Sequence, residues 1–353
     1  MKKLFSPLIL TVLVFLAYSN TWTHSFHFDD VPSILEKPWI RGLDKIPQFI
    51  FSWGQRPLVI LSFNLNYAIS EFEVWSYHLF NIIFHTLAVL LVYLGAKLAH
   101  ETVSRDRLEV RTQTAKLPFL AALIFALHPL QTQSVTYISS RSSIMAAIFF
   151  LAALILFFKA PLFRKSPADL DRPPTQVAGA VCVGGAAVFF LLGLLTKLII
   201  VTLPAILFLF HYYFVSSENT GRWFVEQRKW ILLMIGCLLA GVSYQYFLGG
   251  GLLKAQADAP AAADYFLTQT LAVPLEYFRK MLFPFNLSID SDFPSFQRWG
   301  FLTAWSGVFL LFAFIFFWVR ISFRKTIDTS KDDFHFRRWF GFGMGWILIT
   351  LLP

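Results

Sequence analysis

Charged residues are scarce in this chain of 353 residues, making up 14% against about 25% in a typical soluble domain. Hydrophobic residues make up 56%, and the mean hydropathy is +0.59. A soluble fold could not bury this much apolar surface, which excludes a cytosolic enzyme and a nucleic-acid-binding protein. The chain has only two cysteines, Cys182 and Cys237, each inside an apolar run. They are too few for a secreted disulfide scaffold.

Acidic residues are missing from every long apolar run, although the chain holds 21 of them. Proton- and ion-coupled transporters usually keep ionisable residues at bilayer depth, so this absence disfavours a transporter. The sequence also contains no internal repeat, Walker loop or GxSxG elbow, and no Cys/His cluster with metal-ligand spacing.

Long apolar runs predict an all-α polytopic membrane protein, because about 20 apolar residues in a helix cross the hydrocarbon core. We predict about nine spans by run length. They cover residues 4–20, 76–98, 117–133, 138–158, 176–196, 198–215, 230–248, 300–319 and 339–353. The first follows Met1-Lys2-Lys3 without a small-residue cleavage site, so we expect it to remain as an anchor.

Basic residues predict the orientation. About two thirds of the 30 Lys and Arg residues fall on one side of this layout, mostly in short loops. Those loops are 99–116, 159–175, 216–229 and 320–338. The positive-inside rule therefore places the N-terminus in the cytoplasm. We expect a multi-pass protein of the bacterial inner membrane or, alternatively, of the endoplasmic reticulum membrane.

Two long loops, 21–75 and 249–299, face the outer side in this topology. The first holds apolar residues at helical spacing, namely Leu43, Ile46, Phe49, Ile50 and Trp53. This pattern predicts an amphipathic helix in the membrane interface. The second loop contains an apolar-striped segment at 265–282, which we expect to be a surface-lying or re-entrant helix.

Asp29 and Asp30 follow the first span, in Phe26-His27-Phe28-Asp29-Asp30-Val31-Pro32. Two adjacent carboxylates at a membrane surface could hold a general base or bind a cation. In an extended segment their side chains would point to opposite faces, which implies different roles. The alternative is a helix N-cap, since Asp followed by Pro two residues later is a common helix start.

Three basic residues complement these acids on the same predicted face: Arg56, Arg141 and Lys197. Any one of them could simply extend to the membrane interface. Together, beside a carboxylate pair, they suit an anionic lipid head group. Arg can hold a phosphate with two donors, whereas Lys acts as a point charge.

Several different short motifs lie one after another along almost the whole chain. They are Phe28-Asp29-Asp30, Arg56-Pro57-Leu58, Tyr77-His78-Leu79-Phe80-Asn81, Phe125-Ala126-Leu127-His128-Pro129, Thr136-Tyr137-Ile138-Ser139-Ser140-Arg141, Tyr265-Phe266-Leu267-Thr268-Gln269 and Asp290-Ser291-Asp292-Phe293-Pro294. In order and spacing they resemble the polyprenyl-phosphate-sugar-dependent membrane glycosyltransferases of the GT-C fold. The chain is most similar to the branch of transmembrane O-mannosyltransferases with tetratricopeptide repeats and their bacterial relatives.

Two departures from this family are visible. Relatives usually carry Lys-Glu where this chain has Lys197-Leu198, so one expected acid is missing. The sequence also ends at Leu351-Leu352-Pro353, inside an apolar run. We therefore expect a fragment, residues 1–353 forming one GT-C-like transmembrane domain without the C-terminal repeat domain of relatives.

The resemblance implies transfer of a sugar from a polyprenyl-phosphate donor to an acceptor hydroxyl, expected on a protein, at the outer face with inversion. It implies that Asp29 is the general base and that Asp30 positions the acceptor or the base. Arg56, Arg141 and Lys197 would bind the donor phosphate. The remaining pocket candidates are His78, His128, Asp290 and Asp292. No cofactor is required by this scheme, although paired carboxylates could bind a divalent metal.

Two other functions stay open from the sequence. A non-catalytic carrier or assembly protein for lipid-linked saccharides would use the basic residues but not the acids. A secondary transporter is the third reading, and His85 and His128 are the only titratable residues near span interiors. A single His on an apolar helix is more often a hydrogen-bonded packing residue than a functional group.

Overall fold

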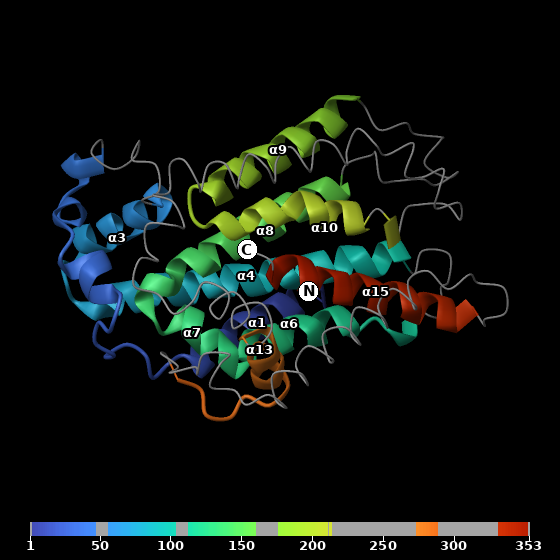
Figure 1. The fold of residues 1–353 in the computed structure, drawn as a ribbon, viewed down its shortest axis with the longest axis horizontal. Helices are drawn as coiled ribbons and strands as arrows, with labels where there is room; N and C mark the ends of the chain where they lie inside the picture. The colour runs from blue at the N-terminus through green and yellow to red at the C-terminus, as the bar shows by residue number, and fades with distance from the viewer. Residues whose placement is uncertain are drawn as a thin grey trace, which may run out of the picture. The chain divides into compact units, whose positions relative to one another are not determined.

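The computed structural model describes residues 2–46, 56–103, 112–159, 176–210, 212–213, 273–288 and 331–351 (Figure 1). All regular elements within these ranges are helical, which confirms the all-α class. The chain divides into two compact units, Met1–Leu203 and Pro204–Pro353.

Five apolar helices that match predicted spans form most of the first unit. They are α1 (Lys2–Ala17), α4 (Val74–Val103), α6 (Leu117–Leu127), α8 (Arg141–Lys159) and α9 (Gln176–Leu194). Figure 1 shows α4 and α8 side by side, and α4 also packs against α1 and α6. Ala122 and Ala126 of α6 are fully buried in this core, because small side chains let helix backbones approach closely.

Five of the predicted spans begin within a few residues of these helices. Two stretches, Val74–Glu101 and Ile138–Lys159, are long and apolar enough to cross a membrane, with 28 and 22 residues. The other apolar helices of the described ranges are shorter, so the count of nine spans is not shown. The predicted spans 230–248 and 300–319 lie outside the described residues.

The segment between α1 and α4 carries more helix than the sequence predicted. It contains η1 (Val31–Leu35), η2 (Pro38–Ile40), η3 (Leu43–Lys45) and α3 (Pro57–Ser70). Ile34, Ile40 and Phe63 are buried there against Tyr77 of α4, which gives this segment a core of its own. Of the predicted amphipathic helix, only the start is described, as η3, and residues 47–55 lie outside the described ranges.

Helix α6 ends at Leu127, earlier than the predicted span end at residue 133. His128 is extended, and Pro129 cannot donate the backbone hydrogen bond that would continue the helix. Three short elements then lead to α8: η4 (Pro129–Gln131), α7 (Thr132–Val135) and η5 (Ile138–Ser140). A similar short element, η8 (Leu198–Thr202), follows α9.

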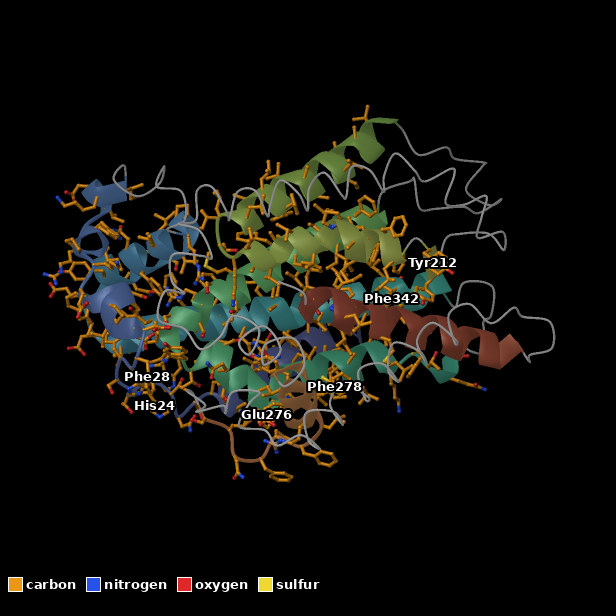
Figure 2. The ribbon with its side chains drawn as sticks, viewed as in Figure 1. His24, Phe28, Tyr212, Glu276, Phe278 and Phe342 are labelled. Carbon is orange, nitrogen blue, oxygen red and sulfur yellow. The ribbon has the colours of Figure 1, made fainter. Side chains whose placement is uncertain are left out.

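The second unit is described in three helices: α10 (Leu203–Phe210, starting at the unit boundary), α13 (Val273–Leu282) and α15 (Lys331–Leu351). Figure 2 shows Glu276 and Phe278 on α13. Glu276 accepts hydrogen bonds from Arg279 at 2.6 and 2.7 Å. Helix α13 forms the second half of the helix predicted at 265–282.

Candidate active site

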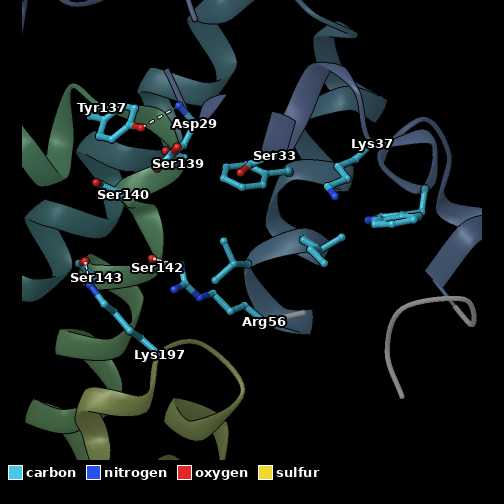
Figure 3. Close-up of a pocket in the computed structure, with 14 residues that line it drawn as sticks. Asp29, Ser33, Lys37, Arg56, Tyr137, Ser139, Ser140, Ser142, Ser143 and Lys197 are labelled. Carbon is cyan, nitrogen blue, oxygen red and sulfur yellow. Dashed lines mark hydrogen bonds between the residues drawn. The ribbon is translucent and has the colours of Figure 1, made fainter. Parts of the chain in front are cut away.

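A cavity of about 340 Å³ opens in the first unit (Figure 3). Its walls come from the segment between α1 and α4, from the start of α8 and from the turn after α9. The lining residues are Asp29, Ser33, Lys37, Trp39, Arg56, Val59, Ile60, Phe63, Tyr137, Ser139, Ser140, Ser142, Ser143 and Lys197. Three residues singled out from the sequence, Asp29, Arg56 and Lys197, therefore meet in one cavity.

Asp29 presents an exposed side chain to this cavity. Phe28, the residue before it, has a φ of 47°, so the chain turns sharply at this point. The Asp29 backbone N–H donates to the Tyr137 hydroxyl at 2.9 Å, and the Asp29 carbonyl accepts from the Ser33 N–H at 3.0 Å. These bonds hold the backbone of the turn, and the Asp29 side chain lines the cavity next to Tyr137.

Asp30 has different surroundings, because its side chain is 1% exposed and does not line the cavity. One carboxylate oxygen accepts from the Ser139 N–H at 2.6 Å, and the other accepts from the His27 N–H at 3.1 Å. Burial raises the pKa of Asp30, and these two N–H donors partly oppose that rise. Asp30 occupies the N-cap position of η1 but makes no side-chain cap hydrogen bond. It therefore ties the Asp29 turn to η5.

Arg56 and Lys197 reach the cavity beside the first turn of α8 (Figure 3). Arg56 Nη1 donates to Ser142 Oγ at 3.3 Å, and Lys197 Nζ donates to Ser143 Oγ at 2.9 Å. Burial lowers the pKa of Lys197, and the positive charge of Arg56 lowers it further. Within the described ranges neither cation forms an ion pair with a carboxylate. Two neighbouring cations with neutral partners favour an anionic ligand.

The position of Arg56 depends on an uncommon backbone conformation. Its φ of 53° and ψ of 61° lie in the left-handed region, immediately before Pro57 at the first turn of α3. Residues other than glycine adopt this conformation at a cost of about 1 kcal/mol or more, and such residues concentrate at functional sites.

Arg141 is not among the cavity residues. Its side chain is fully buried, and the guanidinium donates to Asn81 Oδ1 at 2.6 Å, Asn66 Oδ1 at 2.5 Å, Ser62 Oγ at 3.1 Å and the Tyr77 carbonyl at 2.9 Å. These contacts join α8 to α3 and α4. The structure thus gives Arg141 protein partners and brings two, not three, of the proposed phosphate ligands together.

Two other candidates, His78 and His128, are also not among the cavity lining residues. His78 is buried in α4 with Nε2 2.8 Å from the His24 carbonyl oxygen. His128 accepts from the Leu130 N–H at 3.2 Å and so caps η4. Asp290 and Asp292 lie outside the described residues. In the parts of the chain that are described, no group of three or more His, Cys, Asp or Glu could hold a metal ion.

Sequence reasoning missed several cavity residues. Ser142 and Ser143 hold the two cations, Tyr137 holds the Asp29 turn, and Lys37 and Trp39 line the cavity. The serine run around Arg141, directly before an apolar helix, was the available signal. Lys37 gave no such signal, because its position depends on the fold of the whole segment before α3.

The cavity thus brings an exposed carboxylate, Asp29, together with two cations, Arg56 and Lys197, and the buried Asp30 supports the Asp29 turn. Comparison with known proteins is more specific. The chain is 36% identical over 167 residues to protein O-mannosyl-transferase F38B6.6 of Caenorhabditis elegans. It is 33% identical over 165 residues to protein O-mannosyl-transferase TMTC3 of Mus musculus. It is also 29% identical over 172 residues to protein O-mannosyl-transferase TMTC2 of Homo sapiens.

These matches are distant and partial. They cover 43%, 43% and 44% of this chain, but 23%, 16% and 18% of the relatives, so the match spans about a fifth of their length. No known family profile and no solved structure matches the chain. The matched region is therefore homologous to part of these protein O-mannosyl-transferases.

Proposed function

We propose that this chain transfers a hexose from a polyprenyl-phosphate donor to a hydroxyl of an acceptor protein, with inversion at the anomeric carbon. The observation that carries the proposal is one cavity lined by an exposed carboxylate, Asp29, and by a cation pair, Arg56 and Lys197. The homology to protein O-mannosyl-transferases supports the same reaction class.

The cation pair suits the departing group. A sugar-phosphate-lipid diester carries one negative charge, and the lipid phosphate that leaves gains a second. Arg56 and Lys197 are held by serine hydroxyls before the ligand arrives, so they face the developing charge without rearrangement. Electrostatic stabilisation of this kind is often the largest contribution to catalysis.

Asp29 suits the general base. The acceptor oxygen attacks the anomeric carbon, its proton passes to the Asp29 carboxylate, and the bond from that carbon to the phosphate oxygen breaks with its electron pair on the phosphate. A single displacement of this kind inverts the configuration. Asp30 acts through the backbone of the Asp29 turn, and Arg141 supports the first turn of α8 instead of contacting phosphate. The scheme requires no cofactor.

We place the cavity at the outer face of the membrane, with the N-terminus in the cytoplasm. The positive-inside count supports this orientation, because the cavity residues come from segments opposite the basic loops. The bacterial inner membrane is the first choice of location and the endoplasmic reticulum membrane the second.

Transfer to peptides tests the proposal. The full chain in lipid nanodiscs is incubated with radiolabelled polyprenyl-phosphate mannose or glucose and a Ser/Thr peptide library, and products are identified by mass spectrometry. Asp29→Asn should lower turnover by about 10²–10⁴-fold, since it removes the proton acceptor. The matched control is Asp44→Asn, because Asp44 is exposed in η3, pairs with Lys45 and does not line the cavity.

Three outcomes bear on the proposal. The proposal is supported if the parent protein forms product and if, of the two variants, only Asp29→Asn loses turnover. Equal turnover in the two variants would remove Asp29 from the reaction. Binding of the donor by the parent without any transfer would instead support the non-catalytic carrier.

A further inference from the structure

Lys37, Trp39 and Ser33 line a wall of the cavity that the reaction scheme leaves unused. Figure 3 shows Lys37 across the cavity from Lys197, with Asp29 and Arg56 at two other sides. A sugar that bridges a base at Asp29 and a phosphate at Arg56 and Lys197 must lie between them. Its ring hydroxyls then face this third wall.

Trp39 carries a polar group without a protein partner. Its indole Nε1 is buried and makes no hydrogen bond in the structure. Buried donors are almost always paired, so an unpaired one calls for an explanation. An oxygen of a ligand in the adjoining cavity would supply the missing acceptor once a side-chain adjustment opens access to the buried Nε1.

The backbone around Trp39 is held rigidly. The fully buried Asn64 of α3 donates through Nδ2 to three carbonyl oxygens, those of Trp39 at 3.1 Å, Ile40 at 3.1 Å and Gly42 at 2.7 Å. One amide thus fixes the whole η2 turn against α3. A backbone held in this way fixes where the Trp39 side chain starts, which lowers the entropic cost of ordering the ring when a ligand binds.

Lys37 adds a second donor at the same place. Its Nζ lies 5.1 Å from the centre of the Trp39 ring, a cation–π distance. Its side chain is long and flexible, so the ammonium can leave the ring for a ligand oxygen.

This wall therefore combines two hydrogen-bond donors with an aromatic ring, and none of its three residues, Ser33, Lys37 and Trp39, carries a carboxylate. Donors and an aromatic surface match an oxygen-rich, mostly neutral ligand. We propose that Trp39 and Lys37 form the subsite for the transferred hexose, with the Trp39 N–H donating to a sugar hydroxyl oxygen. This assignment rests on the proposed function.

The test compares two lipids that differ only in the sugar. Equilibrium binding to the full chain is measured in detergent with radiolabelled polyprenyl-phosphate mannose and with radiolabelled polyprenyl phosphate. Trp39→Phe keeps the ring and removes the N–H. It should weaken binding of the sugar-bearing lipid by about three- to ten-fold, the effect of one neutral hydrogen bond, and leave the bare lipid phosphate within two-fold. Lys37→Gln should act in the same direction.

Two controls give the result its meaning. Trp75→Phe makes the same chemical change at an exposed position of α4 and should leave both lipids unaffected. Arg56→Gln should weaken both lipids, because it acts on the phosphate that they share.

The subsite is refuted if the parent binds both lipids equally, or if Trp39→Phe behaves like Trp75→Phe or weakens both lipids alike. It is also refuted if Trp39→Phe leaves both lipids unchanged and raises only the Michaelis constant of the acceptor peptide, which would assign this wall to the acceptor. Failure of the parent to bind either lipid would instead refute the donor site, and the sugar subsite with it.

Discussion

Replacement of Arg141 should destabilise the protein strongly. The fully buried guanidinium makes four hydrogen bonds, and Arg141→Met removes every donor. Ser62 still bonds to the Val59 carbonyl through its own hydroxyl, and the Tyr77 carbonyl lies within α4, where a backbone N–H of the next turn still donates to it. Two acceptors are therefore left bare: Asn81 Oδ1 and Asn66 Oδ1.

The magnitude follows from two opposing contributions. Leaving a buried acceptor unpaired costs about 1–3 kcal/mol, so two of them cost about 2–6 kcal/mol. Removing a buried charge recovers its desolvation penalty, which is several kcal/mol in a protein interior. The guanidinium also lies 4.5 Å from the Phe63 ring centre, a contact that methionine replaces only in part. We expect a net loss of about 2 kcal/mol.

Thermal unfolding in detergent, followed by size-exclusion chromatography, measures the effect. The control is Arg41→Met, because Arg41 makes one exposed hydrogen bond, to the Leu35 carbonyl. Arg141→Met should unfold several degrees below both the parent and this control. Equal stability of the two variants would refute the reasoning and show that the desolvation penalty cancels the network. An Arg141→Lys protein with the parent's unfolding temperature but without donor binding would restore Arg141 as a phosphate ligand.

Three further predictions concern the cavity and the topology. Arg56→Lys keeps the charge but loses one charge-assisted hydrogen bond, which is worth about 1.5–3 kcal/mol. The value of kcat/KM should therefore fall about ten- to a hundred-fold. A value equal to that of the parent would mean that the Arg56 side chain only reaches the membrane interface. The pKa of Lys197 is lowered, so its ammonium should be lost at a lower pH than in an ordinary lysine, and binding of polyprenyl phosphate should weaken as the pH rises toward 10. Lys197→Arg should abolish that pH dependence in the same binding assay, and an unchanged profile would contradict the assignment. The topology can be tested by labelling introduced cysteines in intact cells with a membrane-impermeant thiol reagent. A cysteine at Ser330 should be shielded from the reagent, and one at Ser295 should react. The reverse labelling would overturn the predicted orientation.

The long helices were predictable because their signal is local. Apolar runs reveal α4 and α8 directly, and the all-α class follows from them. Helix α3 was missed because its 14 residues are too few for a span and lie inside what reads as an outer loop. Pro57 at its start and Ser70 at its end are residue types that occur equally in loops, so they do not by themselves predict a helix between them.

The site was predictable only in part, because it is formed by residues that are far apart in the sequence and meet only in the folded chain. The sequence named Asp29, Arg56 and Lys197, and the structure brings them to one cavity. It could not separate Arg141 from them, since all are basic residues on one predicted face. What distinguishes Arg141 is burial against Asn81, a contact between residues 60 positions apart.

The order of the Arg141 partners along the chain has a consequence for synthesis in the membrane. Ser62, Asn66, Tyr77 and Asn81 all precede Arg141, so every acceptor has left the ribosome before the cation does. Domains generally fold from the N-terminus as the chain is made, so the Arg141 hydrogen bonds can form as soon as α8 has been synthesised. Lys197 emerges later still, and the cation pair is complete only when the turn after α9 has docked on Ser143.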